Sequence, residues 1–170
     1  MLFRSVGALI LRRRHGQRPP VQPLSFGGGQ ERGLRPGTLP AHLIAGFGKA
    51  AEVALAECRE RDRCCRLFRE KLLHGLAALD VTINGDPARS VPHIVNFSIP
   101  GVDAETVIEA WEDLAAISDG AACTSASYTC SHVLSAMRIP AEQAAGAVRL
   151  SWCHFSEMPD LRAMAAALPR

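Results

Sequence analysis

Residues 93–114 read HIVNFSIPGVDAETVIEAWEDL, and this stretch decides the fold class. Its first seven residues are rich in β-branched and aromatic side chains, and Pro100-Gly101 closes them, which predicts a strand over 93–99. Asp103 is a favourable N-cap residue for a following helix. Helical spacing then places four apolar side chains on one face, those of Val107, Ile108, Trp111 and Leu114.

Three more short stretches have the character of strands, namely residues 81–83, 116–118 and 147–152. Near the end of the chain, Ser156 is expected to cap a helix that carries Leu161, Met164 and Leu168 on one face. These elements predict an α+β fold, in which helices pack on a layer of about three or four strands.

Residues 41–79 show helical periodicity instead of alternation. Apolar side chains recur at steps of three, four or seven residues, and charged side chains lie elsewhere. The stretch is longer than a typical globular helix, so a break is expected near Arg61-Asp62. Cys58 and Cys65 lie on the apolar stripe and are therefore expected to be core residues. The stripe comprises Leu43, Phe47, Ala51, Ala54, Cys58, Cys65, Phe68, Leu72, Leu76 and Leu79.

The first 40 residues hold a short apolar run and a long loop. Residues 6–11 predict a short buried strand that ends in arginines. Because no acidic residue precedes Glu31, these arginines also resemble an organellar transit peptide, but the strand is the simpler interpretation. The glycine- and proline-rich residues 17–40 could approach an anion through backbone amides and guanidinium groups. An ordinary surface loop explains them equally well.

The composition limits the classes of function. A formal net charge of +2 over 170 residues is too small to indicate binding to nucleic acid or a membrane. No apolar run approaches the ~20 residues that span a bilayer. The six cysteines have no spacing typical of a disulfide framework or a zinc site, so a reducing cytoplasm is the expected compartment.

Residues 118–127 read SDGAACTSAS and place one thiol among small and hydroxylated side chains. Most free cysteines are buried, but this neighbourhood offers no apolar bulk around Cys123 and predicts a mobile, solvent-exposed loop. A helix is expected to follow, capped by Thr129 or Ser131, and its positive end would stabilise a thiolate. Cys123 is therefore the candidate nucleophile.

Two other roles are open for the same region. Cys130 could be a resolving thiol that forms a disulfide with Cys123. Cys123, Cys130 and His132 could also approach a metal ion together, but no paired spacing supports this, and we expect no metal site.

Two blocks of sequence together resemble a known family. They are GGGQERGLRPGTLP at residues 27–40 and SDGAACTSAS at 118–127, about 90 residues apart. The pair is similar to the carboxy-terminal half of the cysteine desulfurases, which are pyridoxal-phosphate enzymes of the class V aminotransferase group. The run that continues through residues 128–132 most resembles the desulfurase of DNA phosphorothioation systems.

The resemblance implies a mechanism and a set of site residues. Cys123 matches the thiol that attacks the sulfur of L-cysteine, which leaves alanine and an enzyme persulfide for a sulfur-acceptor protein. Thr38 matches a residue that reaches the cofactor phosphate of the partner subunit, which implies a homodimer. Arg149 matches the arginine that binds the substrate carboxylate. Judged without the family, Arg149 could equally belong to a buried structural ion pair.

The sequence departs from the family pattern in one important way. The family's cofactor lysine lies just before the strand that opens this chain, whereas Lys49 and Lys71 are the only lysines here and both lie in the helical stretch. Residues 152–154 also differ from the family's usual Leu-Gly-Arg. We therefore expect residues 1–40 to be a remnant of the large cofactor domain, 41–79 a connecting helix, and 80–170 a small domain that bears the thiol loop.

Three hypotheses account for the missing lysine. The chain could be the carboxy-terminal portion of a desulfurase, which is the interpretation we favour and which would be inactive in isolation. It could be half of a split enzyme that another polypeptide completes. It could also be a non-catalytic carrier that accepts a persulfide on Cys123.

Overall fold

The structure is a computed structural model that describes residues 6–13, 15–17, 19–119 and 131–169. Its contacts divide the chain into two units, Met1–Glu57 and Cys58–Arg170. We describe each unit by itself.

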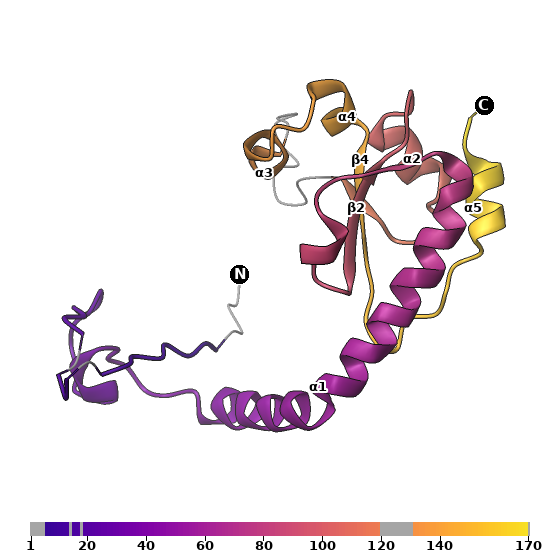
Figure 1. Cartoon of the computed structure of the whole chain (residues 1–170). Coiled ribbons are helices and arrows are strands. Elements are labelled where there is room, and N and C mark those ends of the chain that lie inside the picture. Colours follow the sequence, from indigo (N-terminus) through magenta and orange to yellow (C-terminus); the bar gives the residue numbers. More distant parts are fainter. Residues whose placement is uncertain (1–5, 14, 18, 120–130, 170) are drawn as a thin grey trace. The chain divides into compact units, whose positions relative to one another are not determined.

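The second unit is built on a four-stranded antiparallel sheet (Figure 1). Its strand order is β1-β2-β4-β3, with β2 paired to β4 along the full length of both. This sheet with its helices confirms the predicted α+β fold. The strands are β1 Thr82–Ile83, β2 Ile94–Ser98, β3 Ser118–Asp119 and β4 Ala147–Ser151.

One face of the sheet carries the main core. Phe97 and Val148 are directly paired across β2 and β4 and both are fully buried. Trp111 is also fully buried, and its Nε1 donates to the backbone oxygen of Met164 at 2.8 Å. The helices that supply this core are α2 Ala104–Ala110, α5 Leu161–Ala167 and the part of α1 that belongs to the second unit.

The caps of these two short helices differ in how well the sequence predicted them. Asp103 caps α2 as expected, because its carboxylate accepts from Thr106 N at 2.8 Å. Asp160, not Ser156, caps α5 by accepting from the amides of Arg162 and Ala163. The prediction for Ser156 was wrong because this hydroxyl accepts from Cys153 N at 3.0 Å in a local turn.

On the opposite face of the sheet, two short helices pack against the start of β4. They are α3 His132–Ala136, for which Ser131 occupies the N-cap position, and α4 Ala141–Ala145. Leu134 and Ala144 from these helices pack against Ala147 of β4 in a small second cluster. The other candidate cap, Thr129, lies outside the described residues. Three short 3₁₀ turns complete the described elements, at Gln30–Gly33, Ala77–Leu79 and Pro87–Arg89.

Helix α1 runs without interruption from Ala41 to Leu76. The expected break near Arg61-Asp62 was therefore wrong. No glycine or proline occurs between Lys49 and His74. Ion pairs one turn apart also bridge the expected break, since Arg63 contacts Glu60 at 2.6 Å and Arg66 contacts Asp62 at 2.7 Å. Such pairs favour the helical conformation locally.

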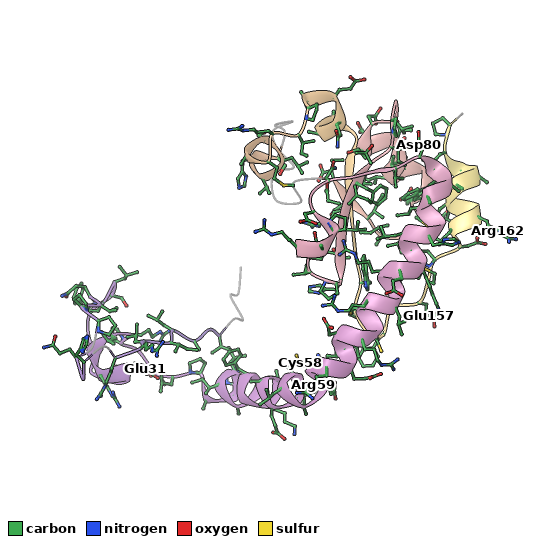
Figure 2. All side chains as sticks on the ribbon, in the orientation of Figure 1. Glu31, Cys58, Arg59, Asp80, Glu157 and Arg162 are labelled. Carbon is green, nitrogen blue, oxygen red and sulfur yellow. The ribbon has the colours of Figure 1, made fainter. Side chains whose placement is uncertain are left out.

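Burial along α1 is uneven. Cys65, Leu72 and Leu76 are buried, as the stripe predicts. Cys58 is exposed, so its predicted place in the core was wrong; Figure 2 labels it on α1. In the second unit, Arg69 fixes α1 to the start of β2, because its Nη1 donates to the backbone oxygens of Val91 at 2.7 Å and Ile94 at 3.3 Å.

The first unit contains the loop of residues 17–40 and the beginning of α1. Residues 6–11 form no strand and are largely exposed, with Ile10 at 90%. The predicted buried strand was wrong because an apolar run forms a strand only where a neighbouring strand satisfies its backbone, and none of the described residues pairs with it. Across the described residues, no helix is both long and apolar enough to cross a bilayer.

Candidate functional site

Arg149 lies in the middle of β4 and points away from the main core. Its strand neighbours Val148 and Leu150 are buried in that core, so alternation places the Arg149 side chain on the opposite face. The residue is half-buried. Within the described residues, no carboxylate or carbonyl accepts a hydrogen bond from its guanidinium. The alternative of a structural ion pair therefore has no partner in that part of the chain.

Two neighbouring strands place polar residues beside Arg149. Its cross-strand partners are Asn96 on β2 and Ser118 on β3. The hydrogen bond from Trp152 N to His93 O, at 3.0 Å, sets the alternation of the β2–β4 ladder. By that alternation, Asn96 and Arg149 form a non-hydrogen-bonded pair, whose Cα atoms are about 4.5 Å apart and whose side chains share one face.

Asn96 also belongs to a hydrogen-bonded network with Asn84, Ser98 and Gln143. Asn84 Nδ2 donates to Asn96 Oδ1 at 2.7 Å and to Ser98 Oγ at 2.9 Å. Gln143 Nε2 donates to Asn84 Oδ1 at 2.6 Å, and Ser98 Oγ donates to the backbone oxygen of Gln143 at 2.7 Å. The network ties α4 to the polar face of the sheet, next to Arg149.

Ser118 connects this face with the predicted thiol. It is paired with Arg149 and precedes Cys123 by five positions in the sequence. Cys123 itself, and Cys130, lie outside the described residues, so their predicted roles stay predictions. The sheet nevertheless places the strand that leads to Cys123 directly beside Arg149.

Thr38 belongs to the first unit. It is exposed, follows Gly37, and precedes the start of α1 at Ala41. Gly37 has a φ of 103°, and its amide donates to Gln30 Oε1 at 3.0 Å, which holds the turn. An exposed hydroxyl beside a glycine turn is compatible with a phosphate contact.

The lysines do not fit the role of a covalent cofactor anchor. Lys49 lies on α1, where its Nζ contacts Glu52 at 3.0 Å on the exposed surface. Lys71 lies on the same helix and is also exposed. Neither lies at the end of a strand, since both are within α1. The residues present thus fit a phosphate contact but not the lysine linkage.

The described thiols differ in their environment. Hydrogen bonds from the backbone of Phe155, then from the Ser156 hydroxyl, lower the pKa of the exposed Cys153. Burial raises the pKa of Cys65, and desolvation, followed by the nearby Glu60 carboxylate, raises that of Cys64. Across the described residues, no group of three or more potential ligands could hold a metal ion.

Sequence reasoning missed Asn96, Asn84 and Cys153. A signal for Asn96 was present, because Asn96 and Ser98 alternate with apolar residues in a strand that has one polar face. Asn84 precedes Gly85, and an Asn-Gly pair is typical of a turn, so nothing local marked it as part of a site. The environment of Cys153 depends on backbone amides, which no spacing rule reveals.

Comparison with known proteins identifies the class to which this fold and site belong. The aminotransferase class-V family model matches residues 5–164, and the chain belongs to that family. This confirms the resemblance seen in the two loops.

Within this family, the chain is similar to cysteine desulfurases. The chain is 41% identical over 159 residues to cysteine desulfurase IscS of Vibrio cholerae serotype O1, which covers 93% of this chain and 39% of the relative. It is equally identical to a mitochondrial cysteine desulfurase of Arthroderma benhamiae, covering 31% of that protein. The chain thus spans about two fifths or less of the length of these relatives.

Two solved structures are similar to this one. The crystal structure of DndA from Streptomyces lividans has a TM-score of 0.65 at 42% identity, covering 81% of this chain and 38% of that one. A NifS-like protein from Rickettsia africae has a TM-score of 0.71 at 27% identity, covering 86% and 38%.

Proposed function

We propose that this chain is the carboxy-terminal portion of a cysteine desulfurase, which converts L-cysteine to L-alanine and holds the released sulfur as a persulfide. The observation that carries the proposal is the 41% identity to cysteine desulfurases over 93% of the chain. The position of Arg149 supports it, because a half-buried guanidinium without a described partner suits a substrate carboxylate.

In this proposal each residue has one task. Arg149 binds the α-carboxylate of L-cysteine and thereby orients the substrate. The thiolate of Cys123 attacks the substrate sulfur, so that an S–S bond forms as the C–S bond breaks. The electron pair of the broken bond stays with the substrate carbon, which takes up a proton and becomes the methyl group of alanine. A persulfide then remains on Cys123.

Pyridoxal phosphate would supply the electron sink that this carbon needs. Thr38 would contact its phosphate, across a homodimer interface. The lysine that would bind pyridoxal phosphate covalently has to be a residue other than Lys49 and Lys71. The persulfide sulfur would pass to an acceptor protein for iron–sulfur assembly, thiolation or DNA phosphorothioation. A reducing compartment such as the cytoplasm suits this chemistry, because the thiol has to stay reduced.

The experiment replaces the matched portion of the Vibrio cholerae relative with this chain and measures alanine formed from L-cysteine. We expect alanine production that is lost in Cys123→Ala and retained in Cys153→Ala, the matched control on an exposed thiol. Alanine production that survives Cys123→Ala would contradict the proposal.

A persulfide carrier without desulfurase activity is the second candidate, and a half of a split enzyme is the third. Lys49 and Lys71 favour both over self-sufficient catalysis, because neither can anchor the cofactor. The isolated chain with added pyridoxal phosphate should form no alanine. A carrier would still accept sulfur from a persulfide donor on Cys123, whereas the chimaera would remain inactive.

A further inference from the structure

We propose that Asn96 is a second carboxylate-binding residue, which acts with Arg149 and is oriented by Asn84, Ser98 and Gln143. This inference rests on the proposed function, in which Arg149 binds the carboxylate of an amino acid. It adds a neutral hydrogen-bond donor, Asn96, to the site. It also adds a hydrogen-bond relay, formed by Asn84, Ser98 and Gln143, that sets the orientation of the Asn96 amide.

The orientation of the relay follows from one backbone carbonyl. The oxygen of Gln143 can only accept, so the Ser98 hydroxyl has to donate to it. Ser98 Oγ therefore accepts from its other neighbour, which turns the Nδ2 group of Asn84 toward Ser98. Gln143 Nε2 agrees with this orientation, because it donates to Oδ1 on the other side of the Asn84 amide.

The same constraint fixes Asn96. Asn84 Nδ2 donates its second hydrogen to Asn96 Oδ1, at 2.7 Å. The side-chain oxygen of Asn96 therefore has to point toward Asn84. Asn84 follows β1, and its amide N donates to the backbone oxygen of Asn96, so it lies on the β1 side of β2. Because the strand order is β1-β2-β4, Nδ2 of Asn96 faces the other side, toward β4 and Arg149.

Two donors therefore stand side by side. The guanidinium of Arg149 has only donors, and the Nδ2 group of Asn96 has two, so they cannot satisfy each other. Within the described residues, neither group has an acceptor. Paired donors at this cross-strand spacing suit the two oxygens of one carboxylate.

The arrangement also explains why a neutral residue stands there. An acidic residue at position 96 would bind Arg149 itself and compete with the substrate. Asn96 accepts from Asn84 as an acid would, yet it offers N–H groups to the site. Asn96 is thus a binding residue, and Asn84 is a positioning residue that acts through it.

The test uses the 170-residue chain and L-alanine, the proposed product, which carries the carboxylate but no reactive sulfur. We would follow the side-chain ¹⁵N–¹H signals of Asn96 and Arg149 during titration. Ethylamine, which lacks the carboxylate, is the matched control ligand. We expect L-alanine to shift both signals and ethylamine to shift neither.

Two variants then separate the roles. Asn96→Asp keeps the acceptor for Asn84 but loses the donors, and we expect at least about ten-fold weaker L-alanine binding. Asn84→Asp leaves Asn96 intact, but its carboxylate now requires a donor, so the Asn96 amide turns over and presents oxygen to Arg149. Weaker binding with a displaced Asn96 signal is expected here too. The backbone amides of Phe97 and Val148 report whether each variant remains folded.

The outcomes distinguish this inference from the proposed function. If Arg149→Gln abolishes binding while Asn96→Asp leaves it unchanged, the role of Asn96 is overturned and that of Arg149 stands. If the unaltered chain shows no L-alanine-dependent shift, the carboxylate pair is overturned, whereas the proposed desulfurase activity is tested separately by the alanine production of the chimaera.

Discussion

The two parts of helix α1, residues 41–57 and 58–76, have very different surroundings. Phe47, on the apolar stripe in the first unit, is 46% exposed, whereas Leu72, on the same stripe in the second unit, is 1% exposed. Leu55, which lies off the stripe in the first unit, is 83% exposed. Apolar side chains follow helical spacing in both parts. The comparison teaches that an amphipathic pattern specifies which face of a helix will be buried, but not which element will bury it. In the second unit β2, β4 and α5 cover that face.

Removing a buried side chain from the second unit's part of α1 should cost the most stability. Leu72→Ala should reduce the free energy of unfolding of the second unit by about 2–5 kcal/mol, because it empties a buried site. Leu55→Ala should change it by about 0.5 kcal/mol or less. Both tryptophans, Trp111 and Trp152, lie in the second unit, so urea unfolding followed by tryptophan fluorescence reports on that unit alone. Equal effects of the two variants would contradict the difference in burial between the two parts of α1.

Two glycines, one in each unit, differ in the space around them. A Cβ at Gly146, just before β4, would lie 2.5 Å from the backbone oxygen of Val102, and a backbone atom cannot move aside easily. Gly146→Ala should therefore destabilise the second unit by about 1–3 kcal/mol. Gly48, in the first unit's part of α1, has open space around it. Gly48→Ala should instead favour the helix by about 0.5–1 kcal/mol, measured by ellipticity at low urea.

The polar network gives a smaller effect on the same unit. Asn84→Ala removes three hydrogen bonds around a buried amide and should destabilise the second unit by about 1–3 kcal/mol. Thr82→Ala, on the adjacent strand at an exposed position, is the matched control. If the two variants unfolded at the same urea concentration, the network would not contribute to the stability of the second unit.

The smallest effect concerns thiol chemistry and leaves stability unchanged. Because hydrogen bonds lower the pKa of Cys153, its thiolate fraction rises at lower pH than that of an ordinary thiol. Burial raises the pKa of Cys65, so its thiolate forms only at higher pH. Alkylation followed by peptide mass spectrometry across neutral pH should label Cys153 before Cys64 and Cys65. The reverse order would show that the local hydrogen bonds do not control reactivity.

Local sequence signals predicted much of the second unit. Asp103 correctly predicted the start of α2, and the β-branched and aromatic residues of 93–99 correctly predicted β2, because caps and strand composition act over a few residues. The cap of α5 was misplaced since Ser156 had a closer partner in Cys153. Residues 6–11 were misassigned because strand formation depends on a neighbour that no local pattern contains. Contacts between strands could not be predicted for the same reason. Arg149 was a candidate site residue, but its pairing with Asn96 is known only from the structure of the sheet.

The most direct measurement is the location of the transferred sulfur. The chain would be incubated with a persulfide donor, digested, and its six cysteine-containing sites compared by mass spectrometry. We predict that the peptide with Cys123 gains one sulfur atom, also in the Cys153→Ser variant, and that Cys123→Ser removes the gain. Sulfur spread evenly over all cysteines, or placed on Cys153 while Cys123 stays unmodified, would contradict the account.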